Sequence, residues 1–204
     1  QQAHGSMAHD GRNAVLALND FLSRMREYRE TLNDRVTELP VTPEASKRAD
    51  VSPTMVEGGY SENIVPDRAA ATFYRTVLPD ETIEQARSEI RELIGDSERA
   101  TAADRFEYEE IMYAEPTQVD ADCEVANVFE SRILDFFSDT APVYSPGSDD
   151  QRFVVNDGGV DQCIVYGPGL LEQAHVADEY VPVSELRTAT KVMAASTADL
   201  MGAL

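Results

Sequence analysis

Apolar residues recur at three- and four-residue spacing in two long segments of the chain, and this period predicts two amphipathic helices. The first covers residues 11–35, and its apolar stripe is formed by Leu18, Phe21, Leu22, Met25, Tyr28 and Leu32. The second covers residues 79–96, has Asp80 as its expected N-cap, and carries a stripe of Ile83, Ala86, Ile90 and Leu93. Each helix is expected to turn its stripe towards a sheet.

Three shorter apolar segments in the same part of the chain have the features of strands. "SPTMVEGG" (52–59) and "AAATFYRTVL" (69–78) flank the turn-rich "YSENIVPDR", and "RFEYEEIMYAE" (105–115) follows the second helix. With the opening "QQAHGS" taken as the end of a strand, the order of elements is β-α-β-β-α-β. This order predicts a ferredoxin-like, four-stranded antiparallel sheet with both helices on one face.

The pattern changes after residue 116. A helix over 121–138, strands near 142–145 and over 161–167, and a final helix over 182–200 are typical of the end of an α/β domain. The polar stretch "AEPTQVDAD" separates the two patterns. The sequence therefore predicts an α/β protein with two domains, one α+β domain over 1–116 and a second domain over 117–204.

The composition indicates what kind of core the protein has and in which cellular compartment it is expected. Of its 204 residues, 42% are hydrophobic, which is enough for a core without disulfide bonds. The two cysteines match no zinc-site spacing and are expected to be reduced. The sequence contains no apolar run of the roughly 18–20 residues that a membrane span needs, and no signal-peptide pattern. We therefore expect a cytoplasmic protein that does not enter a membrane.

The charge is strongly negative, with 38 acidic against 17 basic residues and a net charge of −21. Such a surface repels nucleic acid and anionic membranes, so neither is expected as a partner. Only Lys47 and Lys191 among the bases are lysine. An acidic, lysine-poor surface on a foldable core is typical of a halophilic cytoplasm, where molar salt shortens the Debye length to about 3 Å.

A few polar side chains stand where chemistry is possible, each with an ordinary alternative. His4 lies in a Gly/Ser-rich turn and is either a solvated loop residue or a catalytic one. Arg75 lies in an apolar strand, where its guanidinium either clamps a ligand carboxylate or pairs with one of the many acids. His175 follows a predicted strand and a Gly-Pro-Gly turn, and loops at the carboxyl ends of α/β strands commonly bind ligands.

Four segments, taken in order, resemble a known family. They are "AHGSMAHDGRNAV", "GGYSENIVPDRAAATFYRTVLPDE", "GSDDQRF" and "YGPG…AHVADEYV", and they extend over nearly the whole chain. Together they are similar to motifs of the co-catalytic zinc amidohydrolases and peptidases related to acetylornithine deacetylase, succinyl-diaminopimelate desuccinylase, aminoacylase and glutamate carboxypeptidase. The resemblance identifies the predicted α+β domain as the lid, or dimerisation, domain of that family.

The resemblance implies roles for three residues of the lid. His4 matches the lid histidine that reaches into the active site of the partner subunit and stabilises the oxyanion of the tetrahedral intermediate. Asn63 and Arg75 match residues that hold the substrate near the lid. A homodimer formed through the lid domain is therefore expected.

In the second domain the resemblance implies a metal centre. His175 matches the last metal ligand, and Gly167 and Gly169 match the glycines that shape the loop in front of the site. The complete enzyme is expected to hold two zinc ions, with cobalt or manganese as possible substitutes. The implied reaction is hydrolysis of an amide bond in N-acyl amino acids or small peptides.

The chain departs from the family pattern. Ala8 stands where the lid motif has proline, and Phe73 stands where an aspartate is often found. The family's upstream His-x-Asp and bridging aspartate have no counterpart in this sequence. Its catalytic Glu-Glu pair has none either, because the Glu109-Glu110 of this chain lies in a predicted strand, where neighbouring side chains face opposite sides. We therefore expect a fragment, inactive by itself, with a whole lid and part of a catalytic domain. The alternative is a non-catalytic dimerisation or binding module.

Overall fold

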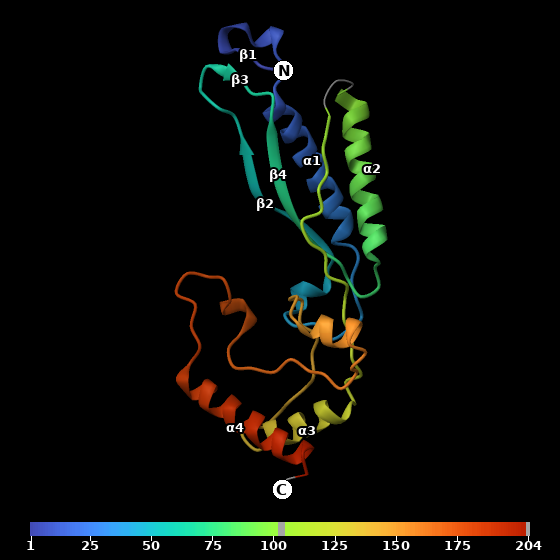
Figure 1. Ribbon diagram of the computed structural model, residues 1–204, viewed down its shortest axis with the longest axis vertical. Coiled ribbons are helices and arrows are strands. Elements are labelled where there is room, and N and C mark those ends of the chain that lie inside the picture. Colours follow the sequence, from blue (N-terminus) through green and yellow to red (C-terminus); the bar gives the residue numbers. More distant parts are fainter. Residues whose placement is uncertain (102–104, 203–204) are drawn as a thin grey trace. The chain divides into compact units, whose positions relative to one another are not determined.

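The computed structural model describes residues 1–101 and 105–202. Its contacts divide it into two compact units, Gln1–Pro116 and Thr117–Leu204, and each is described by itself. The elements of the first unit, labelled in Figure 1, are β1 (Ala3–His4), α1 (Ala14–Leu32), β2 (Asp50–Gly58), β3 (Ile64–Val65), β4 (Ala69–Thr76) and α2 (Ile83–Thr101). Two short 3₁₀ helices, η1 (Gly5–Asp10) and η2 (Glu44–Lys47), complete it.

The strands of the first unit form two antiparallel pairs. β2 pairs with β4 over its whole length, with Val51 opposite Arg75 and a bulge between Pro53 and Met55. β1 pairs with β3 through only two residues of each strand. The β2–β4 pair confirms the two long strands expected over 52–59 and 69–78. The β1–β3 pair lies at one end of the unit (Figure 1).

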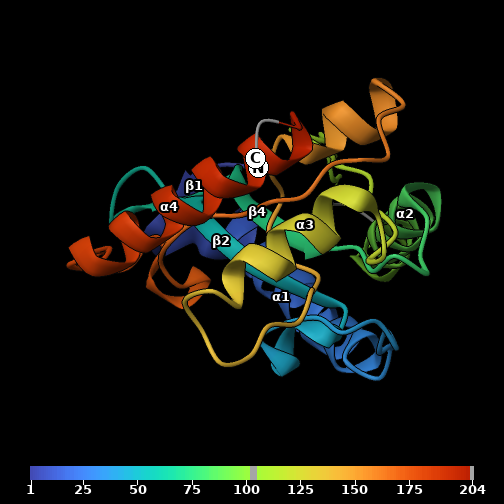
Figure 2. The same ribbon diagram turned by 90° about the horizontal axis from the view of Figure 1, so that it is seen from below.

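The core of the first unit lies between α1, α2 and the β2–β4 pair. Figures 1 and 2 show α1 running along this pair with α2 beside it. The predicted stripe of α1 is confirmed, because all six of its residues belong to the core cluster or pack against it. Phe21 is 7% exposed and packs edge-on against Phe73 at 6.0 Å between ring centroids.

Side-chain caps explain where the two helices begin. Asn13 caps α1, since its Oδ1 accepts the backbone N–H groups of Val15 and Leu16. The expected cap of α2 at Asp80 is wrong. Thr82 and Gln85 bond each other's backbone N–H in a capping box, at 2.9 and 3.1 Å, and satisfy the free donors there, so α2 begins at Ile83.

The predicted strand over 105–115 does not form, and with it the single four-stranded sheet is absent from the described residues. In a split βαβ sheet the fourth strand pairs with the first, which lies at the centre. Here the first strand is only Ala3–His4, so the segment has no ladder to join. Side chains hold it instead: Phe106 packs on Phe21 at 5.4 Å, and Arg87 pairs with Glu110 at 2.6 Å.

The second unit contains two packed helices, α3 (Glu124–Ile133) and α4 (Val183–Leu200), which confirm the two helices expected there. The shorter helical turns are a π-helical turn, η3 (Phe153–Asp157), and a 3₁₀ turn, η4 (Leu171–Gln173). The strands expected near 142–145 and over 161–167 do not form. A strand needs a hydrogen-bonded neighbour, and the described residues of this unit form no strand ladder.

The buried hydrophobic residues of the second unit are few and mostly small: Cys123, Ala126, Ala189 and Val192. Large apolar side chains of α4 remain outside, with Val183 62% and Leu186 52% exposed. Across both units, none of the helices in the described part of the chain is long and apolar enough to cross a membrane.

Candidate functional site

The β1–β3 pair brings together two residues that the sequence singles out, His4 and Asn63. His4 lies opposite Ile64 in the ladder, and the backbone N–H of Gly5 donates to the Asn63 carbonyl at 2.7 Å. A Cβ at Gly5 would lie 3.2 Å from that carbonyl oxygen, so the close approach favours glycine. The side chains of His4 and Asn63 are both exposed. We call this arrangement, residues 3–11 with 61–65, the lid tip.

The imidazole of His4 is held by the turn that follows it. His4 is the N-cap of η1, and its Nδ1 accepts the backbone N–H of Ser6 at 3.2 Å. The Oγ of Ser6 lies 2.9 Å from the same nitrogen. Nε2 makes no hydrogen bond with any residue in the described ranges, so it remains available to an outside group.

Asn63 is also oriented by a neighbour. Its Oδ1 accepts the hydroxyl of Ser61 at 2.9 Å, which leaves the amide NH₂ as a free donor among the described contacts. The lid tip therefore presents one imidazole nitrogen and one amide nitrogen on the same short two-stranded support. Such groups can bind a carbonyl or carboxylate oxygen.

Arg75 faces inward and does not reach the lid tip. Its guanidinium bonds Glu81 at 2.7 and 3.1 Å, and the two side chains are only 11% and 10% exposed. Arg35 adds a third bond to Glu81 at 2.7 Å, and Tyr28 lies against Arg75 and donates to Glu89. Of the two roles open to Arg75 in the sequence, the structure shows the ion pair, with the guanidinium already engaged by a carboxylate of its own chain.

The ionisation of this cluster follows from its contacts. Burial opposes the charge on Glu81, but its bonds to Arg75, the Leu78 amide and Arg35 outweigh burial and lower its pKa. Burial also acts against Arg75, and its bonds to Glu81 and Tyr28 leave its pKa raised. Burial and the bond to Glu89 raise the pKa of Tyr28 to about 12. The cluster therefore keeps both ions charged and Tyr28 neutral near pH 7.

The loop of residues 167–180 holds the other candidates. Gly169 has φ of 91° and donates its N–H to Glu185 at 3.1 Å, so this position needs glycine. His175 and Asp178 have φ of 60° and 61°, a left-handed conformation that costs a non-glycine residue about 1–3 kcal/mol. The carboxylate of Glu179 accepts the His175 backbone N–H at 2.9 Å, and the imidazole of His175 is exposed.

The structure does not assemble a metal centre from the residues it describes. Within 1–101 and 105–202, no group of three or more His, Cys, Asp or Glu side chains is placed to hold an ion. His175 fits as a single imidazole ligand, but a zinc site needs at least three protein ligands. The strand that was the reason for rejecting Glu109-Glu110 as a catalytic pair does not form, and Glu110 is engaged by Arg87 at 2.6 and 2.9 Å instead.

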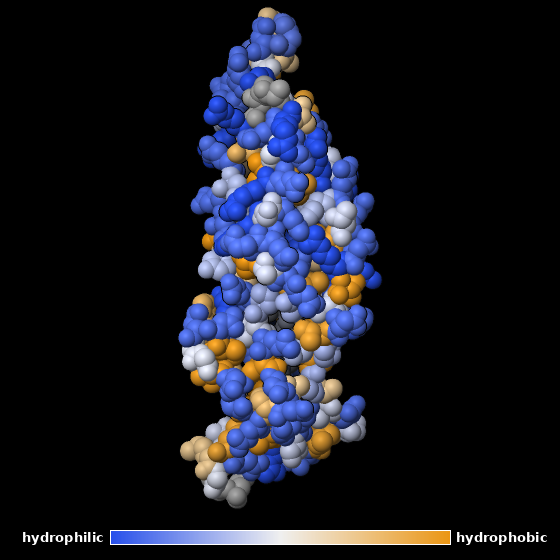
Figure 3. All heavy atoms as spheres, turned by 90° about the vertical axis from the view of Figure 1, so that its right-hand side faces the viewer, coloured by the Kyte–Doolittle hydropathy of each residue, from blue (hydrophilic) through white to orange (hydrophobic). Residues whose placement is uncertain are grey.

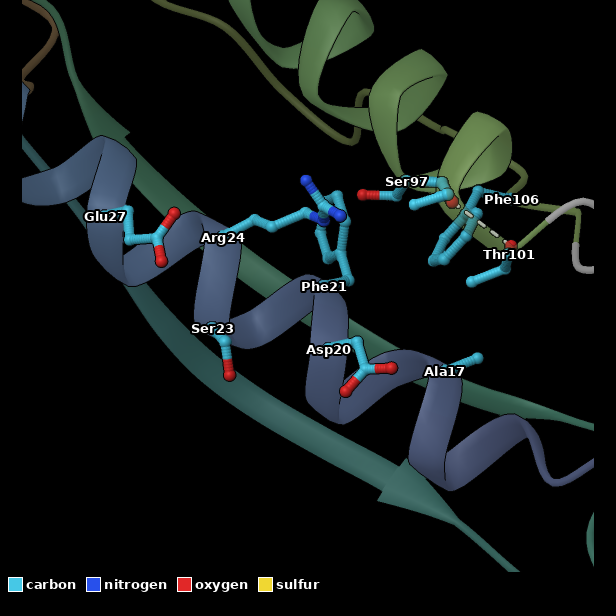
Figure 4. Close-up of a pocket in the computed structure, with 10 residues that line it drawn as sticks. Ala17, Asp20, Phe21, Ser23, Arg24, Glu27, Ser97, Thr101 and Phe106 are labelled. Atoms are coloured by element: carbon cyan, nitrogen blue, oxygen red, sulfur yellow. Dashed lines mark hydrogen bonds between the residues drawn. The ribbon is translucent and has the colours of Figure 1, made fainter.

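A separate pocket of about 370 Å³ lies between α1 and α2. Figure 4 shows the guanidinium of Arg24 reaching from α1 towards Ser97, Thr101 and Phe106. The two hydroxyls are used within the helix, since Ser97 donates to the Leu93 carbonyl and Thr101 to the Ser97 carbonyl. None of the candidate residues of the sequence lines this pocket.

One residue of the lid tip was missed by reasoning from the sequence. Ser6 stands two positions after His4, a spacing at which short polar side chains and amides form local turns. That spacing is the feature of the sequence that could have pointed to Ser6, and the contacts of Ser6 with the imidazole show that the two residues interact.

Residues 1–101 match the family model of the M20 peptidase dimerisation domain. Two solved structures share the fold. The first is a metallo-carboxypeptidase of the M20 family from Sulfolobus solfataricus, with a TM-score of 0.63 and 17% identity; the match covers 96% of this chain and 54% of that one. The second is aminopeptidase PepT from Bacillus cereus, with a TM-score of 0.62 and 17% identity, and the match covers 96% of this chain and 48% of that one.

The curated relatives that match this chain are also named as peptidases. A probable carboxypeptidase of Paracoccidioides brasiliensis is 26% identical over 200 residues, which cover 93% of this chain and 41% of the relative. Another from Ajellomyces capsulatus is 26% identical over 204 residues, covering 93% and 42%. The chain thus spans about two fifths of the length of these relatives. The family resemblance and the α/β fold class are confirmed: the chain carries an M20 peptidase dimerisation domain and continues into a region similar to M20 peptidases.

Proposed function

We propose that this chain supplies the lid and the later part of the catalytic domain of a metal-dependent peptidase or deacylase. The reaction is hydrolysis of an amide bond in an N-acyl amino acid or a small peptide. The observation that carries the proposal is the lid tip, where His4 and Asn63 are exposed, adjacent and held by backbone bonds. The names of the matched relatives, probable carboxypeptidases, agree with this reaction class.

The residues of this chain have separate tasks in the proposed reaction. His4 donates from Nε2 to the oxyanion that forms when the amide carbonyl is attacked, and Asn63 holds the substrate beside it. Gly167 and Gly169 leave room in the loop in front of the site, and His175 is one ligand of the metal. Arg75 is left out of substrate binding, because Glu81 occupies its guanidinium.

The metal is proposed to be zinc, as a pair of ions, with cobalt or manganese as substitutes. When bound, such ions polarise the carbonyl and lower the pKa of a water molecule. The described residues offer His175 but no complete ligand set, so the remaining ligands and the general base would come from another part of the polypeptide. The exposed apolar side chains of α4 support this, because they need a further partner surface to become buried.

We further propose a homodimer formed through the lid. Beyond Ser52 every residue of β2 to Gly58 is exposed, and the neighbours Met55 and Val56, which face opposite sides of the strand, are both 59% exposed. One edge of β2 pairs with β4, and its other edge pairs with no strand of the described chain. An open edge with apolar side chains suits strand pairing with a second copy. In that dimer the lid tip would serve the partner's metal centre.

The acidic surface supports a cytoplasmic, salt-rich setting for this enzyme. Figure 3 shows one face of the molecule, on which hydrophilic residues predominate. The first unit has a well-formed core, and the chain carries a net charge of −21. Screening by salt would weaken the repulsion between two such chains and favour their association.

An activity assay tests the proposal. A polypeptide that extends this chain at its amino end to the length of the relatives should hydrolyse N-acetyl amino acids or dipeptides. A chelator should abolish turnover and zinc should restore it, whereas the 204-residue chain alone should be inactive. The competing function is a non-catalytic dimerisation module, which the lack of a ligand cluster among the described residues favours. A dimer that shows no metal-dependent turnover in the extended polypeptide would establish that alternative.

A further inference from the structure

The contacts of Ser6 with His4 contain information about the proton on the imidazole. A backbone amide nitrogen can only donate a hydrogen bond, so the nitrogen that receives it must offer a lone pair. The backbone N–H of Ser6 points to Nδ1 of His4 at 3.2 Å. Nδ1 therefore carries no proton in this arrangement.

The hydroxyl of Ser6 shares the same lone pair. Because the backbone contact leaves Nδ1 without a proton, the hydroxyl, whose Oγ lies 2.9 Å from Nδ1, is the donor in its own contact. A neutral imidazole has one N–H, so the proton is on Nε2. Nε2 is the nitrogen that has no hydrogen-bond partner in the described part of the chain.

We infer that Ser6 is a positioning residue that locks His4 in the tautomer with the proton on Nε2 and leaves this N–H without a partner among the described residues. The catalytic meaning of the lock rests on the proposed function, in which Nε2 donates to an oxyanion. The tautomer itself is a property of the chain and exists without turnover.

The surrounding backbone explains why the lock is rigid. His4 is fixed in the β1–β3 ladder, and Gly5 between the two residues is bonded to Asn63 at 2.7 Å. Ser6 belongs to η1, whose last turn is closed by the bond from the Gly11 N–H to the Ala8 carbonyl at 3.1 Å. The donor is thus a fixed backbone group, and only the two side-chain torsions of His4 must be ordered to form the contact.

The test is nitrogen NMR of the chain with labelled histidine, in alkaline buffer where the rings are neutral. His4 should show one unprotonated nitrogen, Nδ1, and one protonated nitrogen, Nε2, without averaging. His175 is the internal control, because no hydrogen bond to its ring is formed by the described residues, and its two nitrogens should show the averaged shifts of a mixture. The proposal is overturned if wild-type His4 shows averaged shifts or a protonated Nδ1.

Two variants locate the cause. Ser6→Ala keeps the backbone N–H and should leave the His4 shifts close to wild type. Ser6→Pro removes both donors at a first-turn position that tolerates proline, and should move the His4 shifts to the average seen for His175. Ser61→Ala, which removes the hydroxyl contacts with Glu62 and Asn63 but none with His4, is the matched control and should change nothing at His4. Unchanged His4 shifts in a folded Ser6→Pro chain would contradict the inference. Since no step of this test requires turnover, its failure is distinct from a failure of the proposed enzyme activity.

Discussion

Arg75 and Glu81 form a two-bond ion pair inside the first unit, with Nη2 2.7 Å from Oε1 and Nη1 3.1 Å from Oε2. The pair connects the end of β4 with the turn that leads into α2. Arg35, which follows α1, bonds the same carboxylate at 2.7 Å. Three segments therefore meet at one glutamate that is 10% exposed.

Removal of Arg75 should leave Glu81 with only its bonds to Arg35 and the Leu78 amide. Arg75→Ala is expected to lower the free energy of unfolding by about 1–3 kcal/mol, the range for losing hydrogen bonds to a charged, largely buried group that keeps other partners. Arg26→Ala, at an exposed position of α1, is the control and should change it by less than about 0.5 kcal/mol. Urea unfolding followed by circular dichroism measures both. Equal stability of the two variants would show that Arg75 is free for another role.

The same cluster predicts a dependence of stability on pH. The pKa of Glu81 is lower in the folded chain than its ordinary value of 4.5, so folding favours the ionised form. This stabilisation is complete above about pH 4.5 and is lost as the pH falls through the lower, folded-state pKa. Urea unfolding from pH 7 down to pH 3 should show a shallower decline in Glu81→Gln than in wild type. A residual slope is expected, because Asp50, Glu110 and Asp199 also have lowered pKa values.

Salt should stabilise the chain. With a net charge of −21, surface acids repel one another, and this repulsion is screened as the Debye length shortens from about 10 Å at 0.1 M to about 3 Å at 1 M. The melting temperature should therefore rise steadily when KCl increases over this range. Sucrose at equal osmolality controls for preferential exclusion. A melting temperature that falls with KCl would rule out the halophilic setting.

The 204-residue chain should bind zinc only weakly. One imidazole in a loop with neighbouring carboxylates cannot reach the affinity of a structural site, which corresponds to about 10–16 kcal/mol. Calorimetric titration at neutral pH should give micromolar or weaker binding, equal for His175→Ala and the control His9→Ala. Nanomolar binding that disappears only in His175→Ala would show that the chain builds its own centre.

Local periodicity allowed much of the first unit to be predicted, and tertiary pairing limited the rest. The apolar stripes of α1 and α2 follow from the 3.6-residue period of a helix, which does not depend on the surface that the helix packs against. They were therefore predicted correctly. Residues 105–115 have the pattern of a strand, but a ladder depends on the neighbour, which here is too short. The choice between ligand clamp and ion pair for Arg75 could not be made from the sequence, because many acids were available as partners. The family resemblance singled out His4 and Asn63 separately, and their adjacency became visible only in the structure, because it depends on the β1–β3 pairing.

The most direct test of the account mixes subunits of the polypeptide extended to the length of the relatives. His4→Ala alone should lower kcat by about 10²–10³ with little change in KM, the scale for loss of one oxyanion donor. His175→Ala alone should lose activity through the metal. If each active site combines the metals of one subunit with His4 of the other, mixed dimers of the two variants should regain a clear fraction of wild-type activity. Mixed dimers that form but stay inactive would contradict the claim that the lid tip acts across the dimer.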